Sequence, residues 1–182
     1  MIKVCLADNH PVTHFGVKSY FKDHDQISIV ANVGNFSMVR DILQTKEIDI
    51  LILDLELEGL SSIFEVKSIL KNFPKTKIVI FSDLAEQMYA PNAIKAGVSG
   101  YVHKTEKLET LGLSIIKVHE GKIIINETVR KNMALIAKQS KSERLYRKLS
   151  NREIEVLRYL SDGKKNNEIS KILNLNEKTI ST

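Results

Sequence analysis

Residues 48–54 read IDILILD, an apolar run that ends in an aspartate. A run of this kind is typical of a strand that is buried on both faces, as strands of parallel sheets are. Similar runs occupy Ile2 to Ala7, Ile27 to Val33 and Lys77 to Phe81, and a weaker one occupies Gly100 to Val102. The sequence therefore predicts a five-stranded parallel sheet.

Segments with helical spacing of apolar residues separate these strands. They occupy Val12 to Phe21, Ser37 to Gln44, Ile63 to Leu70, Met88 to Lys95 and Leu108 to Val118. Pro91 restricts the fourth segment, because proline is tolerated only in the first turn of a helix. The regular alternation of strand and helix predicts a doubly wound α/β domain over residues 1–122, with right-handed crossovers.

A linker and a second, small domain follow the α/β domain. Glu127 to Lys138 has the spacing of another helix, and the ten residues after it are mostly polar, with four Lys/Arg against one Asp/Glu. We therefore expect a linker over residues 123–148. The remaining residues, 149–182, are expected to form a small all-α domain.

The small domain has the pattern of a helix-turn-helix. Ser150 or Asn151 can cap a first helix, and Gly163 can end it. This helix is expected to bury a stripe formed by Ile154, Leu157 and Leu160. A second helix is predicted over Asn167 to Leu173, and a third is predicted to begin near Glu177.

Charge and hydropathy narrow the functional classes. The net charge is +5, and residues 139–182 hold ten Lys/Arg against six Asp/Glu. A basic segment suits the phosphate backbone of a nucleic acid, although a solvated surface explains the same charge.

No apolar run approaches the ~20 residues that cross a bilayer, and the N-terminus does not resemble a secretory signal. We therefore expect a cytoplasmic protein that makes no contact with a membrane.

Polar residues stand at the ends of four of the five predicted strands. Asp8-Asn9 follow the first strand and Asp54 follows the third, while Ser82 and Lys104 follow the fourth and fifth. Sites in open α/β sheets form beyond the carboxyl ends of the strands, where the strand order reverses. Each residue alone could be a helix cap or an ordinary loop residue. Their joint occurrence at one edge of the sheet predicts a functional site.

The charges of these residues point to a kind of chemistry. A flavodoxin-like strand order of 2-1-3-4-5 would place Asp8 and Asp54 side by side. Two carboxylates in a dry crevice repel each other, and a hard divalent cation together with a fixed ammonium relieves the repulsion. Lys104 would supply the ammonium, and Mg²⁺ would be the cation. Such a site suits phosphoryl transfer, in which a protein mainly positions groups and neutralises charge.

Five stretches of the chain resemble one protein family. They are ADNHP at 7–11, LILDLELEG at 51–59, IVIFSD at 78–83, AGVSGYVHK at 96–104 and LSNREIEVLRYLSDGKKNNEISKILNLNEKTIS at 149–181. Their order and spacing resemble those of NarL/FixJ-class two-component response regulators, in which a receiver domain precedes a LuxR-type helix-turn-helix. The resemblance covers nearly the whole chain.

The resemblance implies a role for each residue at the strand ends. Asp54 would accept a phosphoryl group from a sensor histidine kinase. The Mg²⁺ ligands would be Asp8, Asn9, Asp54 and the backbone carbonyl of Glu56. The residues that respond to the phosphoryl group would be Ser82, Tyr101 and Lys104. The protein would be a homodimeric regulator of transcription and not an enzyme.

Asn9 departs from the family pattern, which usually has a second acidic residue at this position. An amide oxygen can coordinate a cation but carries no charge, so we expect Mg²⁺ to bind more weakly. Phosphorylation is then expected to be weakened and not abolished. The alternative is a receiver that works without phosphorylation by pairing with another regulator.

The recognition surface for DNA is expected to be truncated at its C-terminal end. In the family the third helix enters the major groove, whereas this sequence reaches only its first turns. The residues expected to contact DNA are Lys164, Lys165, Asn167, Lys178, Thr179 and Ser181.

Overall fold

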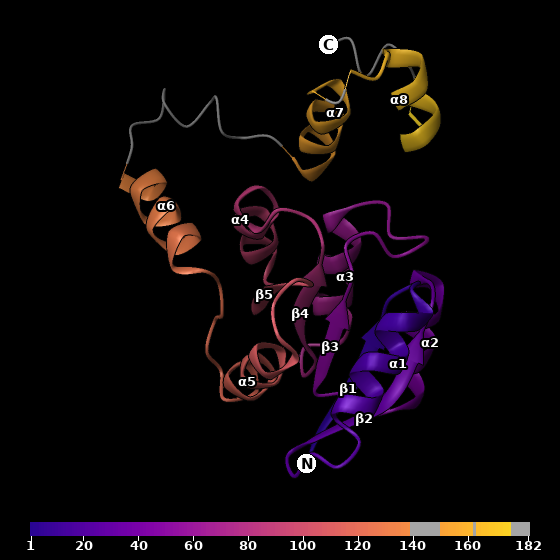
Figure 1. The fold of residues 1–182 in the computed structure, drawn as a ribbon, viewed down its shortest axis with the longest axis vertical. Helices are drawn as coiled ribbons and strands as arrows, with labels where there is room; N and C mark the ends of the chain where they lie inside the picture. Colours follow the sequence, from indigo (N-terminus) through magenta and orange to yellow (C-terminus); the bar gives the residue numbers. More distant parts are fainter. Residues whose placement is uncertain (139–149, 162, 176–182) are drawn as a thin grey trace. The chain divides into compact units, whose positions relative to one another are not determined.

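The computed structural model describes residues 1–138, 150–161 and 163–175 (Figure 1). Its contacts divide the chain into two compact units, Met1–Leu135 and Ile136–Thr182. The first unit contains the sheet and the helices around it, and the part of the second unit that the structure describes is helical. In the part of the chain that the structure describes, no helix has the length and apolar character needed to cross a membrane.

The sheet of the first unit has five parallel strands in the order β2-β1-β3-β4-β5, which confirms the predicted topology. The strands are β1 (Ile2–Ala7), β2 (Ile27–Val33), β3 (Ile50–Leu53), β4 (Lys77–Ser82) and β5 (Gly100–His103). Along β1 and β3, Ala7 pairs with Leu53, so both strands end at the same level. The order of the strands reverses between these two, as the proposed site requires.

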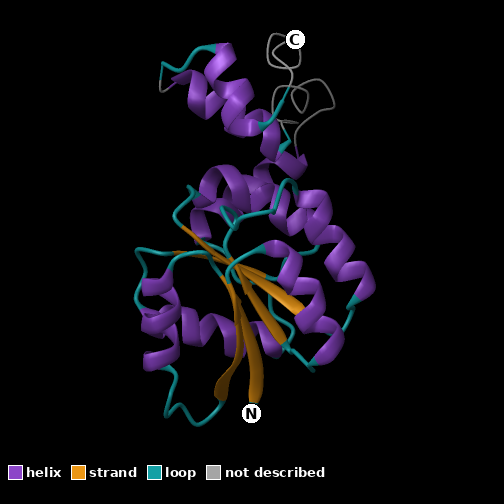
Figure 2. Cartoon of the chain, turned by 90° about the vertical axis from the view of Figure 1, so that its right-hand side faces the viewer, coloured by secondary structure: helices purple, strands orange, loops and turns teal. Residues whose placement is uncertain are grey.

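Helices flank both faces of the sheet (Figure 2). They are α1 (Pro11–Tyr20), α2 (Phe36–Thr45), α3 (Ile63–Asn72), α4 (Glu86–Ala96) and α5 (Leu108–His119). Alternate strand residues such as Leu6 and Ile52 join one core cluster with Phe21, which follows α1, and Leu111 of α5. The residues between them, such as Leu51, are buried on the opposite face. Burial on both faces explains why the strands are almost continuously apolar.

Pro91 lies deeper in its helix than the sequence predicted. Helix α4 begins at Glu86, so Pro91 is in the second turn and not in the first. Proline has no N–H for the carbonyl four residues earlier, and an interior proline costs about 3 kcal/mol. Tyr89, Ala90 and Ala93 are buried on either side of it. Packing of this face therefore offsets the poor local propensity.

The residues after α5 extend the first unit beyond the sheet. The Tyr101 N–H donates to the Ile124 carbonyl at 2.8 Å, and the Ile124 N–H donates to the Ser99 carbonyl at 2.9 Å. The Asn126 N–H donates to Glu86 Oε1 at 2.6 Å, in the first turn of α4. The next helix, α6 (Glu127–Lys138), buries Val129 to 1% exposure. The start of the expected linker is thus held along the edge of β5.

In the second unit, α7 (Asn151–Ser161) and α8 (Asn166–Leu173) are the two helices that the structure describes, and they pack on each other. Ser150 is the N-cap of α7, since its hydroxyl accepts from the Glu153 N–H at 3.2 Å and the Glu153 carboxylate accepts from the Ser150 N–H at 2.5 Å. This reciprocal pair is a capping box. Gly163, at φ +79°, follows α7 as predicted. The predicted third helix lies outside the described residues.

The predicted apolar stripe of the first of these helices is only partly buried. Ile154 is 9% exposed, in agreement with the prediction, but Leu157 and Leu160 are 48% and 40% exposed. The described element that packs on α7 is α8, which buries Ile169 and Leu173. A helix of eight residues covers only part of the apolar face of α7.

Cys5 provides a test of the buried sheet. It lies in β1 with no exposed surface, and burial raises the pKa of its thiol to about 12. Because the thiolate is the reactive form, we expect a disulfide reagent at pH 8 to modify Cys5 at least about 100-fold more slowly in the folded protein than in denaturant. The release of the reporter thiol measures both rates. Equal rates would contradict the placement of β1 at the centre of the core.

Candidate functional site

The parallel ladder brings three charged residues to one edge of the sheet. Asp8 follows β1, and its N–H donates to the Val33 carbonyl at 3.1 Å. Asp54 follows β3, and its N–H donates to the Ala7 carbonyl at 2.9 Å. Lys104 follows β5, and its N–H donates to the Ser82 carbonyl at 3.0 Å. Hydrogen bonds that continue the sheet therefore fix the backbone of each residue.

Lys104 links the two carboxylates. Its Nζ lies 2.8 Å from Asp8 Oδ2 and 2.7 Å from Asp54 Oδ2. Both aspartate side chains are 1% exposed and that of Lys104 is 10% exposed, so water screens these ion pairs weakly. The sequence prediction that these three residues meet at the switch point agrees with this geometry.

The pKa values of Asp8 and Lys104 reflect two opposing effects. Burial is the largest single influence on Asp8 and acts to raise its pKa, but hydrogen bonds from Lys104 and His10 outweigh it, so that the pKa is lowered. Burial also acts to lower the pKa of Lys104, but the hydrogen bonds to Asp54 and Asp8 outweigh it and the pKa is raised. The charged forms are therefore stabilised by one another.

Ser82 and Tyr101 are connected through the loop between β4 and α4. Ser82 is fully buried at the end of β4, and its Oγ accepts from the Leu84 N–H at 3.4 Å. The Tyr101 hydroxyl donates to the Leu84 carbonyl at 2.8 Å. Tyr101 is 2% exposed, and burial raises the pKa of its phenol. The ring is thus held inside the protein by the same loop residue that contacts Ser82.

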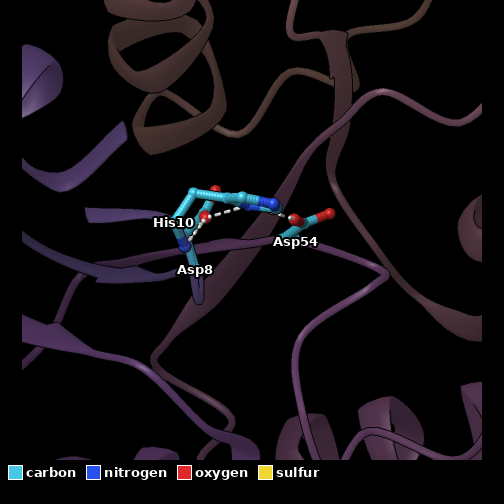
Figure 3. A group of neighbouring side chains, drawn as sticks. All are labelled: Asp8, His10 and Asp54. Carbon is cyan, nitrogen blue, oxygen red and sulfur yellow. Dashed lines mark hydrogen bonds and ion pairs between the residues drawn. The ribbon is translucent and has the colours of Figure 1, made fainter. Parts of the chain in front are cut away.

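His10 belongs to the site although the sequence analysis gave it no role (Figure 3). The backbone N–H of His10 donates to Asp8 Oδ1 at 2.7 Å, and the ring Nδ1 lies 2.9 Å from the same oxygen. The Nδ1 atom lies 4.0 Å from Asp54 Oδ2. A histidine two residues after Asp8 and directly before Pro11, the first residue of α1, was the signal available in the sequence.

The donor set of the site suits a divalent cation. One ligand atom each from Asp8, His10 and Asp54 can be chosen so that all three lie within 4.8 Å of one another. The two carboxylates are buried and acidic, so this cluster can bind Mg²⁺. Asn9 is exposed and lines a pocket with Pro11 and His14 of α1. The side chain of Glu56 is exposed, and the backbone N–H of Glu56 donates to Asp54 Oδ1 at 3.2 Å.

Half of the residues expected to contact DNA lie in the described part of the second unit. Lys164, Lys165 and Asn167 are exposed at the start of α8, where Lys165 is the N-cap. The other three, Lys178, Thr179 and Ser181, lie outside the described residues.

Comparisons with known proteins match both units. The model of the response regulator receiver domain matches residues 4–116, and that of the luxR family of bacterial regulatory proteins matches residues 147–182. The Fimbriae Z protein of Salmonella typhimurium is 31% identical over 98% of this chain and 84% of its own length. Response regulator UvrY of Escherichia coli is 26% identical over 100% of this chain and 84% of its own length.

Solved structures agree with the fold. RcsB of Salmonella enterica serovar Typhimurium, bound to promoter rprA in the presence of a phosphomimetic, has a TM-score of 0.70 with this chain at 24% identity, and the match covers 99% of this chain and 87% of RcsB. A second RcsB structure has a TM-score of 0.68 at 25% identity, over 100% of this chain and 88% of that protein. Fold, topology and family models agree, and the chain belongs to the response regulators that combine a receiver domain with a LuxR-type helix-turn-helix.

Proposed function

We propose that Asp54 accepts a phosphoryl group from a sensor histidine kinase and thereby switches a DNA-binding transcription regulator. The observation that carries the proposal is the buried contact of 2.7 Å between Asp54 Oδ2 and Lys104 Nζ at the carboxyl edge of the sheet. Asp54 is the central acid of this edge, because β3 lies between β1 and β4. A regulator of this kind acts in the cytoplasm and is not an enzyme.

The proposed reaction needs only positioned groups and compensating charge. An oxygen of the Asp54 carboxylate forms a bond to phosphorus while the P–N bond of the kinase phosphohistidine breaks, and the leaving imidazole takes a proton from solvent. Lys104, already 2.7 Å from Asp54, offsets the charge that arrives. When bound by Asp8, Asp54 and the Glu56 carbonyl, Mg²⁺ would neutralise further charge on the phosphoryl oxygens. Asn9 would weaken this binding, because it contributes no charge.

The loop between β4 and α4 offers a path for the switch. A phosphoryl group on Asp54 adds strong hydrogen-bond acceptors near Ser82. If the Ser82 hydroxyl turns toward them, it gives up its contact with the Leu84 N–H. Movement of Leu84 would release the hydroxyl of Tyr101, whose ring could then change rotamer. The loop between β4 and α4 would thus adopt one packing when Asp54 is phosphorylated and another when it is not.

The response is proposed to reach DNA through the second unit. We propose a receiver domain over residues 1–122, a linker over 123–148 and a DNA-binding domain over 149–182. Exposed Lys164, Lys165 and Asn167 lie at the start of α8, where they could contact phosphates. Lys178, Thr179 and Ser181 complete the proposed contacts. A homodimer is proposed, because helix-turn-helix proteins commonly bind two half-sites as dimers.

Intact mass after incubation with acetyl phosphate and Mg²⁺ tests the acceptor. We expect the protein to gain one phosphoryl group and Asp54→Asn to gain none, because an amide is not a nucleophile for phosphorus. Asp83→Asn is the matched control: it removes an exposed acid beside the site and should keep the gain. A phosphoryl group on Asp54→Asn would assign the acceptor elsewhere.

A second candidate function follows from Asn9. Lys104 pairs with both carboxylates, and the chain has one acid fewer than the family pattern. A receiver that pairs with another regulator without phosphorylation would need no more than this. Absence of any phosphoryl gain in the unmodified chain, at high Mg²⁺ and at high Mn²⁺, would favour this function over the first.

A further inference from the structure

We propose that His10 is a ligand of the divalent cation at this site, in place of the carboxylate that Asn9 does not provide, and that the site therefore prefers a first-row transition-metal cation to Mg²⁺. The inference rests on the proposed function, because it concerns the cation that supports phosphoryl transfer to Asp54. It assigns a residue and a metal class that differ from those expected from the sequence.

The first argument is the spacing of the donor atoms. Ligand atoms that lie about 2.0–2.2 Å from one cation are at most about 4.4 Å apart. His10 Nδ1 lies 2.9 Å from Asp8 Oδ1 and 4.0 Å from Asp54 Oδ2. Figure 3 shows the imidazole of His10 reaching from Asp8 toward Asp54. All three ligand atoms lie within 4.8 Å of one another, so one cation can contact the three side chains after small movements.

The second argument is how the imidazole is held. The backbone N–H of His10 donates to Asp8 Oδ1 at 2.7 Å, and Pro11 begins α1 at the next residue. These two constraints fix the backbone of His10 beside the carboxylates. Its side chain is 57% exposed, whereas the carboxylates are 1% exposed. A cation from solvent would thus meet the imidazole at the open side of a buried acidic pair.

The third argument is the charge and hardness of the set. Lys104 pairs with Asp8 Oδ2 and with Asp54 Oδ2, and Asp8 Oδ1 faces His10. A cation bound by Asp54 Oδ2 would share that oxygen with Lys104. Mg²⁺ prefers oxygen ligands in octahedral geometry. Imidazole is a good ligand for Co²⁺, Ni²⁺ and Zn²⁺ and a weaker one for Mn²⁺. With an imidazole in the set and Asn9 in place of an acid, the set favours the transition metals.

Binding of Co²⁺ to the full chain tests the proposal directly. The visible absorption of Co²⁺ reports nitrogen coordination, and titration gives its affinity. We expect His10→Gln to weaken Co²⁺ binding by at least about tenfold, with little effect on Mg²⁺. His119→Gln is the matched control, since His119 is an exposed histidine at the end of α5. Asn9→Asp is expected to raise the Mg²⁺ affinity by about tenfold, because it adds a carboxylate.

The outcomes separate this proposal from the proposed function. If His10→Gln and the unmodified chain bind Co²⁺ equally, or Mg²⁺ binds more tightly than Co²⁺, His10 is not a ligand and the proposal is overturned. That result leaves phosphorylation of Asp54 with Mg²⁺ intact. If Co²⁺ binding depends on His10 while no cation supports phosphorylation, the metal proposal stands and the proposed function fails. Circular dichroism of His10→Gln checks that the variant is folded.

Discussion

Replacement of Lys104 by methionine is expected to lower the free energy of unfolding by about 3–5 kcal/mol. The Nζ atom of Lys104 lies within 2.8 Å of Asp8 and 2.7 Å of Asp54, both of which are buried. Methionine keeps most of the volume of the lysine stem but removes the ammonium. Two carboxylates would then remain in a dry crevice without compensation, which is more costly than the loss of a surface ion pair.

A double-mutant cycle isolates this charge effect. Asp54→Asn removes one of the two carboxylates, so in the Lys104→Met background it should restore most of the lost stability. Lys107→Met is the matched control, because Lys107 is exposed, and it should change stability by no more than about 0.5 kcal/mol. Urea unfolding at pH 7, with chelator present to remove metal cations, measures the four proteins of the cycle and the Lys107→Met control. Equal effects of Lys104→Met and Lys107→Met would contradict the proposed compensation.

The pH dependence of the difference follows from the signs of the pKa shifts. The lowered pKa of Asp8 gives stability that is present above its unfolded value of about 3.9 and is lost as the pH falls through the folded value. The raised pKa of Lys104 gives stability that is present below about 10.4 and is lost as the pH rises through the folded value. The stability that these ion pairs give the unmodified chain should therefore be constant between these limits.

The sequence predicted the positions at the strand ends well, for a geometric reason. In a parallel sheet every strand ends at the same edge, so a polar residue directly after a buried run needs no further information to be placed. Asp8, Asp54 and Lys104 come together for this reason, and Ser82 ends the strand between the last two. The apolar runs fixed the register that brings them to one level.

Residues whose position depends on tertiary packing were not predictable in this way. From the sequence, the ring of His10 could point to solvent or to Asp8, and only the folded chain shows its Nδ1 at 2.9 Å from Asp8 Oδ1. Pro91 indicated a helix start near residue 88, yet the burial of Tyr89 and Ala90 sustains a helix from Glu86. Leu157 has the spacing of a core residue but is 48% exposed. Apolar spacing identifies the face of a helix that can be buried, but it does not identify the element that would cover this face.

The start of the expected linker is the clearest case of this limit. Ile124 has no periodic pattern around it that marks a strand, yet its N–H and carbonyl pair with Ser99 and Tyr101 at the edge of β5. An edge strand with unpaired backbone groups attracts any segment that can complete its hydrogen bonds. The contacts therefore group residues up to Leu135 with the first unit, although residues from 123 onward are the proposed linker.

Val129→Asp is expected to lower the free energy of unfolding of the first unit by about 3 kcal/mol. Val129 is 1% exposed, and the loss of its buried side chain costs about 1.5–3 kcal/mol. Burial of the new carboxylate adds a desolvation cost. This cost is limited, because α6 can detach and expose residue 129 to water. Thr128→Asp is the matched control, since Thr128 is the exposed neighbour, and it should change stability by no more than about 0.5 kcal/mol.

Hydrogen exchange of the Tyr101 and Ile124 amides locates the effect of Val129→Asp. Both amides form hydrogen bonds that join the start of β5 to the segment before α6, so both should exchange faster in Val129→Asp and at the original rate in Thr128→Asp. Unchanged exchange in both variants would mean that α6 is independent of the sheet edge. Because Asn126 also donates to Glu86 in the first turn of α4, four residues after Ser82, detachment of α6 would act on the same loop that the proposed switch moves. Phosphorylation of Asp54 would then change the docking of the linker through contacts already present in the chain.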